Sequence, residues 1–193
     1  VSPTPTPSVT AAAPVISGIH SIDPLGDQDE NGSKAPRAID GKEDTFWKSS
    51  SYRTSAFGGL KKGLGLVVDL EEASRVTEVT VIGSGSGGEL ELRTADDPDY
   101  EGSTLVAKGT LTDGRVTLTV EPEAADGDTK TDPDAKTDPD AKTDPDAKTD
   151  PDDAATAGTA TGTDPVEHLV LWFTDLPQVG GEYRAEVREI EVR

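Results

Sequence analysis

Apolar residues recur at every second position in several short runs of this chain, and glycine-rich or aspartate-rich stretches separate the runs. Alternation of this kind, with many β-branched side chains, predicts half-buried β-strands. Before residue 121 the pattern predicts strands at 15–22, 66–70, 76–82, 89–94 and 116–120. No run has the spacing of three and four residues that an amphipathic helix shows. The alternation therefore predicts an all-β fold.

The segment 168–174, His-Leu-Val-Leu-Trp-Phe-Thr, is almost entirely apolar. Runs of this kind are typical of a strand that is covered on both faces, so the segment predicts a central strand. A last strand is predicted at 183–192. Because residues 167–193 are too few to form a domain, these strands must complete a sheet that begins earlier in the chain. The expected fold is one antiparallel β-sandwich of the jelly-roll kind, with about seven or eight strands.

Two segments lack the strand pattern. Residues 1–14 alternate proline with threonine and serine, which favours an extended polyproline linker. Residues 121–165 contain Lys-Thr-Asp-Pro-Asp-Ala three times from Lys130, followed by a fourth copy that ends in aspartate. Proline at every sixth position prevents helix formation and strand pairing. The predicted organisation is a linker, 1–14, and a β-sandwich, 15–193, interrupted by a disordered acidic loop at 121–165.

Charge and composition exclude several classes of partner and chemistry. The 193 residues carry 38 acidic and 18 basic side chains, a formal net charge of -20, which repels nucleic acid. The chain has no cysteine, so disulfides and thiolate metal sites are excluded. No apolar run approaches the roughly 20 residues of a membrane span. Any membrane attachment is therefore expected only through a segment outside this sequence.

The sequence offers no convincing catalytic constellation. His20 and His168 stand alone, outside any zinc-binding or G-x-S-x-G spacing, and each is interpreted as a strand residue with a hydrogen-bonded ring. The glycine-rich stretch 83–88 lacks the lysine and the following helix of a phosphate-binding loop, so it predicts a turn. The chain is expected not to be an enzyme.

The residues 38–49, Ala-Ile-Asp-Gly-Lys-Glu-Asp-Thr-Phe-Trp-Lys-Ser, resemble the A-x-D-G-x-x-x-T-x-W-x-S signature of discoidin-like domains, which are also called F5/8 type C or galactose-binding-like domains. Residues 65–70 and 188–192 resemble the strand that follows the signature and the closing strand of that family. The resemblance implies a non-enzymatic binding module with a β-sandwich fold.

Three further blocks, 23–31, 57–66 and 171–176, resemble the extracytoplasmic C-terminal domain of actinobacterial pseudokinase proteins associated with the MviN/MurJ-type lipid II flippase. This narrower resemblance implies a module of the cell envelope, at the outer face of the plasma membrane, that a linker joins to a membrane helix. The chain is expected to be a monomer. The expected partner is a cell-wall glycan, either peptidoglycan or a lipid-linked precursor. The alternative is an envelope protein, for which the chain would act as a scaffold domain.

Many discoidin-like domains hold one structural calcium ion. Carried over to this sequence, the resemblance implies calcium ligands at Asp40, Asp44, Thr45 and Glu189, with the carbonyl of Arg37 as a further ligand. Calcium takes six to eight oxygen ligands from carboxylates, hydroxyls and carbonyls, so the set is chemically suitable. The ion would join a loop to the last strand.

The alternation of the last strand gives a separate reason to examine Glu189. Glu189 alternates in step with three apolar residues, Tyr183, Ala185 and Val187. Because every second side chain of a strand points to the same face, this pattern places Glu189 on the inward face. A buried carboxylate needs a cation, an arginine, or a β-bulge that turns it outward. Because Ile190 has the opposite parity, the sequence leaves the bulge open as an alternative.

A second, weaker calcium signal lies at residues 27–32, Asp-Gln-Asp-Glu-Asn-Gly, which match the first half of an EF-hand loop. The twelfth position of that loop is Ala38, where an EF-hand has a bidentate glutamate. An acidic loop that is rich in turns is the preferred interpretation.

A sugar site needs an aromatic face and polar hydrogen-bonding groups. Tyr52, Arg53 and Phe57, in the loop after the signature, are the candidates for contact with a ligand, with packing of the loop as the alternative. Trp47 and Trp172 lie within apolar strand patterns and are expected to be core residues.

Overall fold

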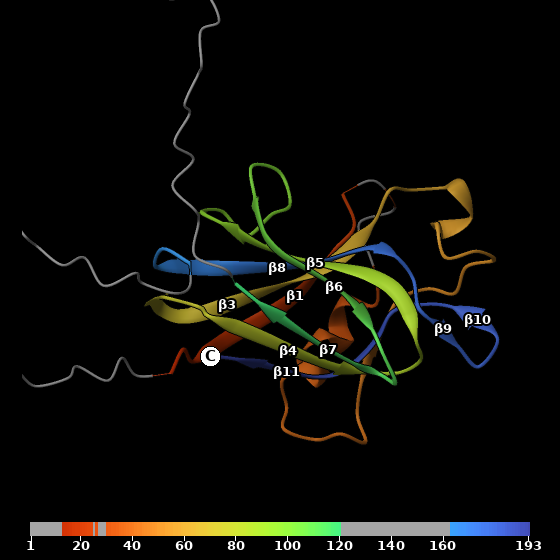
Figure 1. Cartoon of the computed structure of the whole chain (residues 1–193), viewed down its shortest axis with the longest axis horizontal. Helices are drawn as coiled ribbons and strands as arrows, with labels where there is room; N and C mark the ends of the chain where they lie inside the picture. Colours follow the sequence, from red (N-terminus) through yellow and green to blue (C-terminus); the bar gives the residue numbers. More distant parts are fainter. Residues whose placement is uncertain (1–12, 25, 27–29, 121–162) are drawn as a thin grey trace, which may run out of the picture. The chain divides into compact units, whose positions relative to one another are not determined.

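A computed structural model describes residues 13–24, 26, 30–120 and 163–193 of the chain. Its strands form two facing antiparallel sheets, which Figure 1 shows as two layers. In spatial order, the larger sheet contains β1 (Ile16–Ile22), β3 (Leu64–Ser74), β8 (Val166–Asp175), β5 (Gly87–Ala95) and β6 (Thr104–Leu111). The smaller sheet contains β2 (Trp47–Lys48), β11 (Glu186–Val192), β4 (Glu78–Gly83) and β7 (Arg115–Thr119). The predicted antiparallel sandwich is confirmed.

Three short elements connect or flank the sheets. Two 3-10 helices, η1 (Gly32–Ala38) and η2 (Phe57–Gly59), precede β2 and β3. The two-residue strands β9 (Gln178–Val179) and β10 (Glu182–Tyr183) form a small hairpin before β11. These elements place loops at the strand ends, where most of the polar contacts described below are made.

The core lies between the two sheets. Leu66, Leu92 and Leu171 of the larger sheet and Val81 and Ile190 of the smaller one belong to the same buried apolar cluster. Each of these side chains is at most 3% exposed. The alternation in the sequence thus marks the inward face of each strand, because successive side chains of a strand point to opposite faces.

Strand β8 is covered on both faces, as its apolar sequence predicts. It pairs with β3 on one side and with β5 on the other. Leu171 faces the core, whereas Val170 and Trp172 belong to a second apolar cluster on the outer face of the larger sheet. The ring of Trp172 lies against Gly63, where an added Cβ would come within 2.4 Å of the indole. Trp172 is 2% exposed and Trp47 is fully buried, so the interpretation of both tryptophans as core residues is confirmed.

Two features of the strand pattern differ from the prediction. The sequence indicates no strand at β6, because this edge strand has only one buried residue, Leu111. The last strand predicted at 183–192 is observed but begins later, since β10 ends at Tyr183 and β11 runs from Glu186 to Val192. Between them Arg184 donates its N–H to the carbonyl of Pro177, and Ala185 donates its N–H to the hydroxyl of Ser49. These bonds turn the chain from one small sheet into the other.

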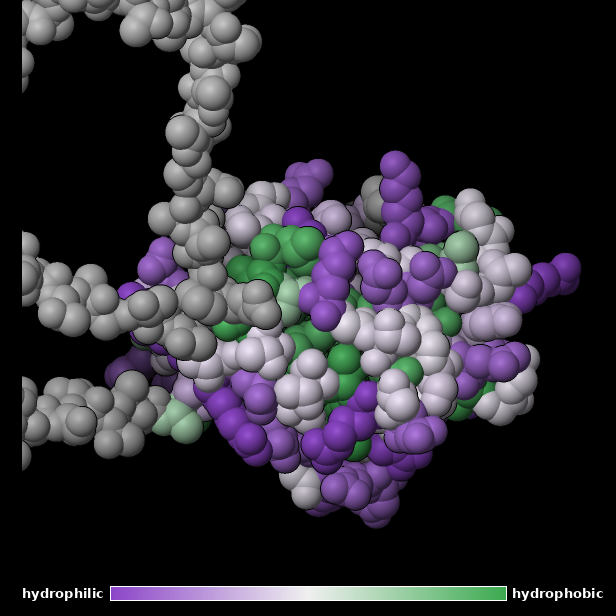
Figure 2. Space-filling view, viewed as in Figure 1, coloured by the Kyte–Doolittle hydropathy of each residue, from purple (hydrophilic) through white to green (hydrophobic). Residues whose placement is uncertain are grey.

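Several predicted features lie outside the described residues. They are residues 1–12 of the linker, almost all of the acidic repeat loop, and Asp27 to Asp29 of the half EF-hand pattern. Within the described residues, no helix is long and apolar enough to span a membrane. On the face seen in Figure 2, hydrophilic side chains predominate, with small apolar areas between them.

Candidate functional site

A buried ion-pair network lies beneath the loops that follow β1 and β2. The Nζ of Lys61 is 2.6 Å from Oδ2 of Asp23 and 2.6 Å from Oε1 of Glu30. The three side chains are 7%, 0% and 2% exposed, respectively. Charges that are this deeply buried are tolerated only when they are paired and hydrogen-bonded. One ammonium group therefore serves two carboxylates.

Glu30 is the centre of this network. Its carboxylate also accepts hydrogen bonds from the N–H of Ser50 at 2.8 Å and from the hydroxyl of Tyr52 at 2.7 Å. Its backbone carbonyl accepts a bond from the indole N–H of Trp47 at 2.7 Å. Together with Lys61, these bonds connect the segment at Glu30 to β2 and to the loop that follows it. These bonds therefore hold in place the loop after β2, which carries the candidate sugar-binding residues.

The proton affinities of the network reflect its pairing. Burial alone would raise the pKa of Glu30, but the hydrogen bonds from Lys61, Ser50 and Tyr52 outweigh it and hold the pKa below its usual value. Burial would lower the pKa of Lys61, but bonds to Asp23, Glu30 and Tyr52 raise it. Burial and the neighbouring Glu30 raise the pKa of Tyr52 to about 12. At neutral pH Glu30 and Lys61 are therefore charged, and Tyr52 is protonated.

The loop that follows β2 presents only part of the expected ligand-binding group. Phe57 is 1% exposed and packs edge-on against Tyr52, with ring centroids 5.4 Å apart. Its φ of 54° and that of Gly58, 63°, turn the backbone so that the phenyl ring enters the core. Tyr52 is half-buried, and Arg53 is exposed. Phe57 therefore packs the loop, which is the alternative that the sequence left open for these residues. Arg53 remains accessible to a ligand.

The expected calcium residues come together in part. The hydroxyl of Thr45 donates to the carboxylate of Asp40 at 2.8 and 2.9 Å, and the N–H of Gly41 donates to Oε2 of Glu189 at 2.9 Å. The last strand is thus joined to the signature loop, as the sequence analysis expects. Asp44 and Arg37 are exposed.

The orientation of Glu189 differs from the simple parity argument. A β-bulge lies between Val187, which pairs with Gly83, and Glu189, which pairs with Ile82. After the bulge Ile190 belongs to the core. The prediction that Glu189 faces inward is therefore wrong, and the alternative of a bulge is the one observed. The extra residue shifts the alternation by one position.

Among the residues that the structure describes, no cationic side chain forms an ion pair with Glu189. Burial raises the pKa of Glu189, and the negative charges of Asp40 and Glu191 raise it further, against the effect of the bond from Gly41. Within the described residues, no group of three His, Cys, Asp or Glu side chains is arranged to hold a metal ion. The oxygen donors of Asp40, Thr45 and Glu189 nevertheless suit a hard cation, and calcium stays a prediction.

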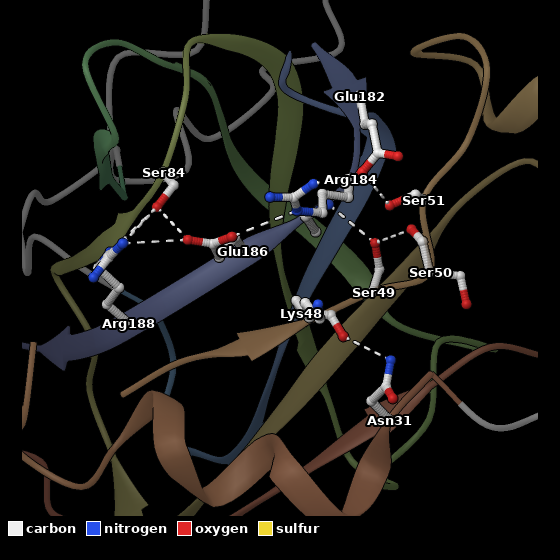
Figure 3. Close-up of polar contacts among 11 residues, drawn as sticks. Asn31, Lys48, Ser49, Ser50, Ser51, Ser84, Glu182, Arg184, Glu186 and Arg188 are labelled. Atoms are coloured by element: carbon white, nitrogen blue, oxygen red, sulfur yellow. Dashed lines mark hydrogen bonds and ion pairs between the residues drawn. The ribbon is translucent and has the colours of Figure 1, made fainter. Parts of the chain in front are cut away.

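A second set of ion pairs joins β11 to its neighbours, as Figure 3 shows. Glu186, which is 5% exposed, accepts a hydrogen bond from Ser84 at 2.5 Å. Arg188 lies 3.3 Å and Arg184 lies 3.5 Å from the same carboxylate. Arg188 also donates to the backbone carbonyl of Glu43 at 2.7 Å. The residue within the bulge thus holds the loop that contains Asp40 and Thr45.

Short bonds align β2 beside this group (Figure 3). The amide of Asn31 donates to the carbonyl of Lys48 at 2.9 Å, and the hydroxyl of Ser49 donates to the carbonyl of Ser50 at 2.8 Å. Ser51 donates to Glu182 at 3.1 Å. Asn31 has a left-handed φ of 56°, which asparagine tolerates better than most residues. These contacts order the start of the loop that carries Tyr52.

Both histidines lie beside one carboxylate on the outer face of the larger sheet. The Nδ1 of His168 is 2.8 Å from Oδ1 of Asp69, and the Nδ1 of His20 is 3.7 Å from Oδ2. His20 and His168 belong to β1 and β8, on either side of β3. The interpretation of both as strand residues is confirmed.

Sequence reasoning missed the ion-pair network. Asp23 and Lys61 lie in blocks that are notable only for the family resemblance, and Glu30 lies in the half EF-hand pattern as well, but no periodic pattern around them predicts burial. The available signal was Lys61 itself, a long cationic side chain between Leu60 and the glycines that lead into β3. A lysine at such a position is also compatible with an exposed loop, so only the tertiary contacts identify it.

Comparison with known proteins supports the fold assignment. No family model matches the sequence. The CBM32 of AlyQ, solved in complex with 4,5-unsaturated mannuronic acid, superimposes with a TM-score of 0.54 at 12% identity and covers 94% of this chain and 98% of its own. The family 32 CBM of Clostridium perfringens NanJ, in complex with galactose, gives 0.50 at 17% identity over 91% of each chain.

A third structure, of the CBM32-1 and CBM32-2 domains from Clostridium perfringens ZmpB, gives a TM-score of 0.52 at 13% identity. The superposition covers 92% of this chain and 34% of the ZmpB chain. At these identities the similarity concerns the fold. The chain has the galactose-binding-like, discoidin-like β-sandwich that is also found in CBM32 modules.

Proposed function

We propose that this chain is a non-catalytic module that binds glycans through the loops above the buried ion-pair network. The observation that carries the proposal is the network itself, in which Lys61 and Glu30 fix Tyr52 and the following loop. A loop that is ordered before binding loses less conformational entropy when the ligand arrives. The sugars bound by the AlyQ and NanJ modules support this class of ligand.

The chemistry of the loop suits recognition without catalysis. Arg53 presents a planar guanidinium group to solvent, and this group can donate several hydrogen bonds to sugar hydroxyls or carboxylates. The Tyr52 hydroxyl donates to Glu30, which leaves the exposed part of its ring for apolar contact. The acid and base groups of the network are engaged with one another, so they hold the loop in place.

The finer parts of the proposal concern the biological setting. The ligand would be peptidoglycan or a lipid-linked precursor, and the module would act as a monomer outside the cytoplasm, in the cell envelope. It would be attached to the outer face of the plasma membrane through a segment beyond this sequence, in a protein with a pseudokinase part. The sequence blocks at 23–31, 57–66 and 171–176 support this setting.

Calcium would have a structural role in this module. Asp40, Thr45 and Glu189 would provide side-chain oxygens, and nearby carbonyl oxygens would complete the shell. Burial and the negative charges of Asp40 and Glu191 raise the pKa of Glu189, and a bound cation would offset both, which supports the assignment. The ion would stabilise the connection between the signature loop and β11 that the Gly41 bond already makes.

The proposed function is tested by screening the complete chain against a glycan array and purified muropeptides, with calcium present. We expect retention of a defined set of glycans, and a loss of at least about tenfold in affinity for Arg53→Ala, because a hydrogen-bonding charge is removed from the contact. The control is Arg115→Ala, which removes an exposed arginine from edge strand β7. If no glycan is retained, glycan binding is the wrong function.

One observation favours protein binding as a second candidate function. Leu60, in the same loop, is 79% exposed, and a large apolar side chain at a loop tip is suited to a protein interface. Crosslinking in a native envelope, compared with Leu60→Ser, distinguishes the two. A discrete protein adduct that disappears in the variant would support the scaffold role.

A further inference from the structure

A cavity of about 320 Å³ lies where the end of β1 faces the loop 96–103. It is lined by Ser21, Ile22, Asp23, Pro24, Pro98 and Asp99. His20 joins its two walls, because Nε2 of the imidazole is 3.4 Å from the carbonyl oxygen of Pro98. Small-molecule pockets run from about 300 to 1,000 Å³, so this cavity suits a single sugar ring.

The loop that forms one wall is held in place. Tyr100 stacks on Trp172, with ring centroids 4.1 Å apart, and the guanidinium of Arg93 lies 4.9 Å from the Tyr100 ring. Arg93 also donates to the hydroxyl and to the carbonyl of Ser103, at 2.8 and 2.9 Å. This wall of the cavity is therefore held in place without a ligand.

The polar groups at the cavity include two carboxylates. Asp99 is exposed, and its Oδ1 accepts the N–H of Tyr100 at 2.6 Å. Asp23 is fully buried and shares Lys61 with Glu30. Its second oxygen, Oδ1, is buried and has no hydrogen-bond partner among the residues that the structure describes. Asp23 and Glu30 share the single ammonium group of Lys61, so the wall behind the cavity carries an excess of negative charge.

The cations nearest to the cavity are already paired. Lys61 is bound between Asp23 and Glu30, and Arg93 is 2.7 Å from the carboxylate of Glu91. The exposed Asp96 and Asp97 add negative charge to the same loop as Asp99. An anionic sugar would meet uncompensated repulsion here, whereas an ammonium group would be attracted.

We propose that this cavity binds a sugar that carries a free amino group, with the exposed Asp99 as the acceptor that recognises it and the buried Asp23 adding negative charge behind the wall. The inference rests on the proposed glycan-binding function and names a site and a ligand class for it. Ile22, Pro24 and Pro98 would contact the apolar parts of the ring, and Asp99 would select the ammonium group. Uronic acids are excluded from this site.

The test is to titrate the full chain with glucosamine and, in separate experiments, with N-acetylglucosamine and with glucuronic acid. Binding is measured from the changes in backbone amide chemical shifts by NMR. We expect shifts at Ser21, Ile22, Asp99 and Tyr100, with binding of glucosamine about tenfold tighter than that of N-acetylglucosamine, because acetylation removes the charge. Glucuronic acid should produce no shifts at these residues.

The variant Asp99→Asn keeps an acceptor for the Tyr100 N–H but removes the charge, and we expect a loss of several-fold in glucosamine affinity. The matched control is Asp113→Asn, at the exposed turn between β6 and β7, where a φ of 49° also suits asparagine. The control should bind glucosamine like the original chain.

Three results would overturn the inference: equal affinities for the amino and acetylated sugars, no effect of Asp99→Asn, or shifts confined to the acidic repeats at 130–153. In each of these cases, a glycan array that still shows specific binding leaves the proposed function intact. If the array is also blank, the proposed function is wrong as well.

Discussion

Two loops of this module are joined to the sandwich through carboxylates, and they differ in how the negative charge is balanced. Glu30 is buried, with the ammonium of Lys61 at 2.6 Å, and its pKa is lowered. Glu189 is half-exposed, accepts one backbone N–H, and has a raised pKa because of burial, Asp40 and Glu191. The first carboxylate is paired with a cation of the protein, whereas the second has no paired cation among the described residues.

The contrast shows that neither burial nor acidity alone reveals where a cation belongs. The more deeply buried carboxylate is the one whose charged form is favoured, because three donors surround it. The more exposed carboxylate is the one whose charged form is disfavoured, because its partial burial and the nearby Asp40 and Glu191 raise its pKa, and a single backbone N–H does not offset them. Adding calcium would therefore stabilise the fold through Glu189, whereas removing the ammonium group of Lys61 would destabilise it through Glu30.

The largest expected effect is the loss of the protein cation. Lys61→Met leaves the buried carboxylates of Asp23 and Glu30 without their ammonium group, and we expect the free energy of unfolding to fall by about 3–5 kcal/mol. Denaturant unfolding followed by tryptophan fluorescence measures it. Lys62→Met, in the exposed neighbour, is the control and should change little. If both variants unfold at the same denaturant concentration, the network does not stabilise the loop.

The second-largest expected effect is the stabilisation by calcium at the loop that Glu189 joins to β11. With a dissociation constant of about 10⁻⁴ to 10⁻³ M, as in extracellular modules, calcium at about 10 mM would stabilise the fold by about 1.4–2.7 kcal/mol. Thermal melting with calcium and then with chelator measures the difference. Magnesium at the same concentration is the control for ionic strength. Identical melting midpoints with calcium and with chelator would show that calcium does not stabilise this fold.

A smaller effect tests one donor of the Glu30 network. Tyr52→Phe removes the hydroxyl that donates to Glu30 at 2.7 Å, and we expect a loss of about 1.5 kcal/mol, at the lower end for hydrogen bonds to charged groups. Lys61 and Ser50 still serve the carboxylate. Denaturant unfolding of Tyr183→Phe, a half-buried tyrosine on β10, provides the comparison, and an equal loss in both would argue against a specific role for the bond.

The smallest effect concerns the pH dependence of Glu189. Because its folded pKa is raised, the folded state binds more protons, and stability falls as pH rises from the unfolded value of 4.5 through the folded pKa. Without calcium, Glu189→Gln should remove this loss, on the order of 0.5 kcal/mol, since solvent screens a half-exposed group. The Glu30 network behaves in the opposite way and loses stability as pH falls below 4.5.

Melting curves from pH 3 to pH 7 separate these contributions. In the calcium form, Glu189→Gln should instead lower stability, because the carboxylate ligand is lost. A variant that melts like the original chain at every pH, with and without calcium, would show that Glu189 carries no unbalanced charge.

The fold could be predicted from the sequence because its information is local. Alternating residues identify β1, β4, β5 and β7, and the apolar run identifies β8 as a central strand. Edge strand β6 escapes detection, since its side chains alternate little and few are buried. In β11 the bulge at Arg188 interrupts the alternation, and no local signal states on which side of Glu189 the bulge lies.

The candidate site could be predicted only in part, because its contacts join distant residues. The signature at 38–49 predicts that Asp40, Thr45 and Glu189 meet, and the Asp40–Thr45 and Gly41–Glu189 bonds are observed. The sequence gives no indication that Lys61 reaches both Asp23 and Glu30. Likewise, the burial of Phe57 depends on two successive positive φ angles, which a loop sequence with two following glycines permits but does not require.

The position of β8 and β11 constrains the order in which this protein can fold. Each strand lies between two partners, β8 between β3 and β5 and β11 between β2 and β4. Both are made after the acidic repeats, so a ribosome that has synthesised residues 1–120 has produced neither central strand. Until residue 192 emerges, the flanking strands expose edges and apolar faces that nothing in the chain can yet cover. Assembly of this sandwich is therefore expected to follow synthesis, with non-local pairing as its slow step.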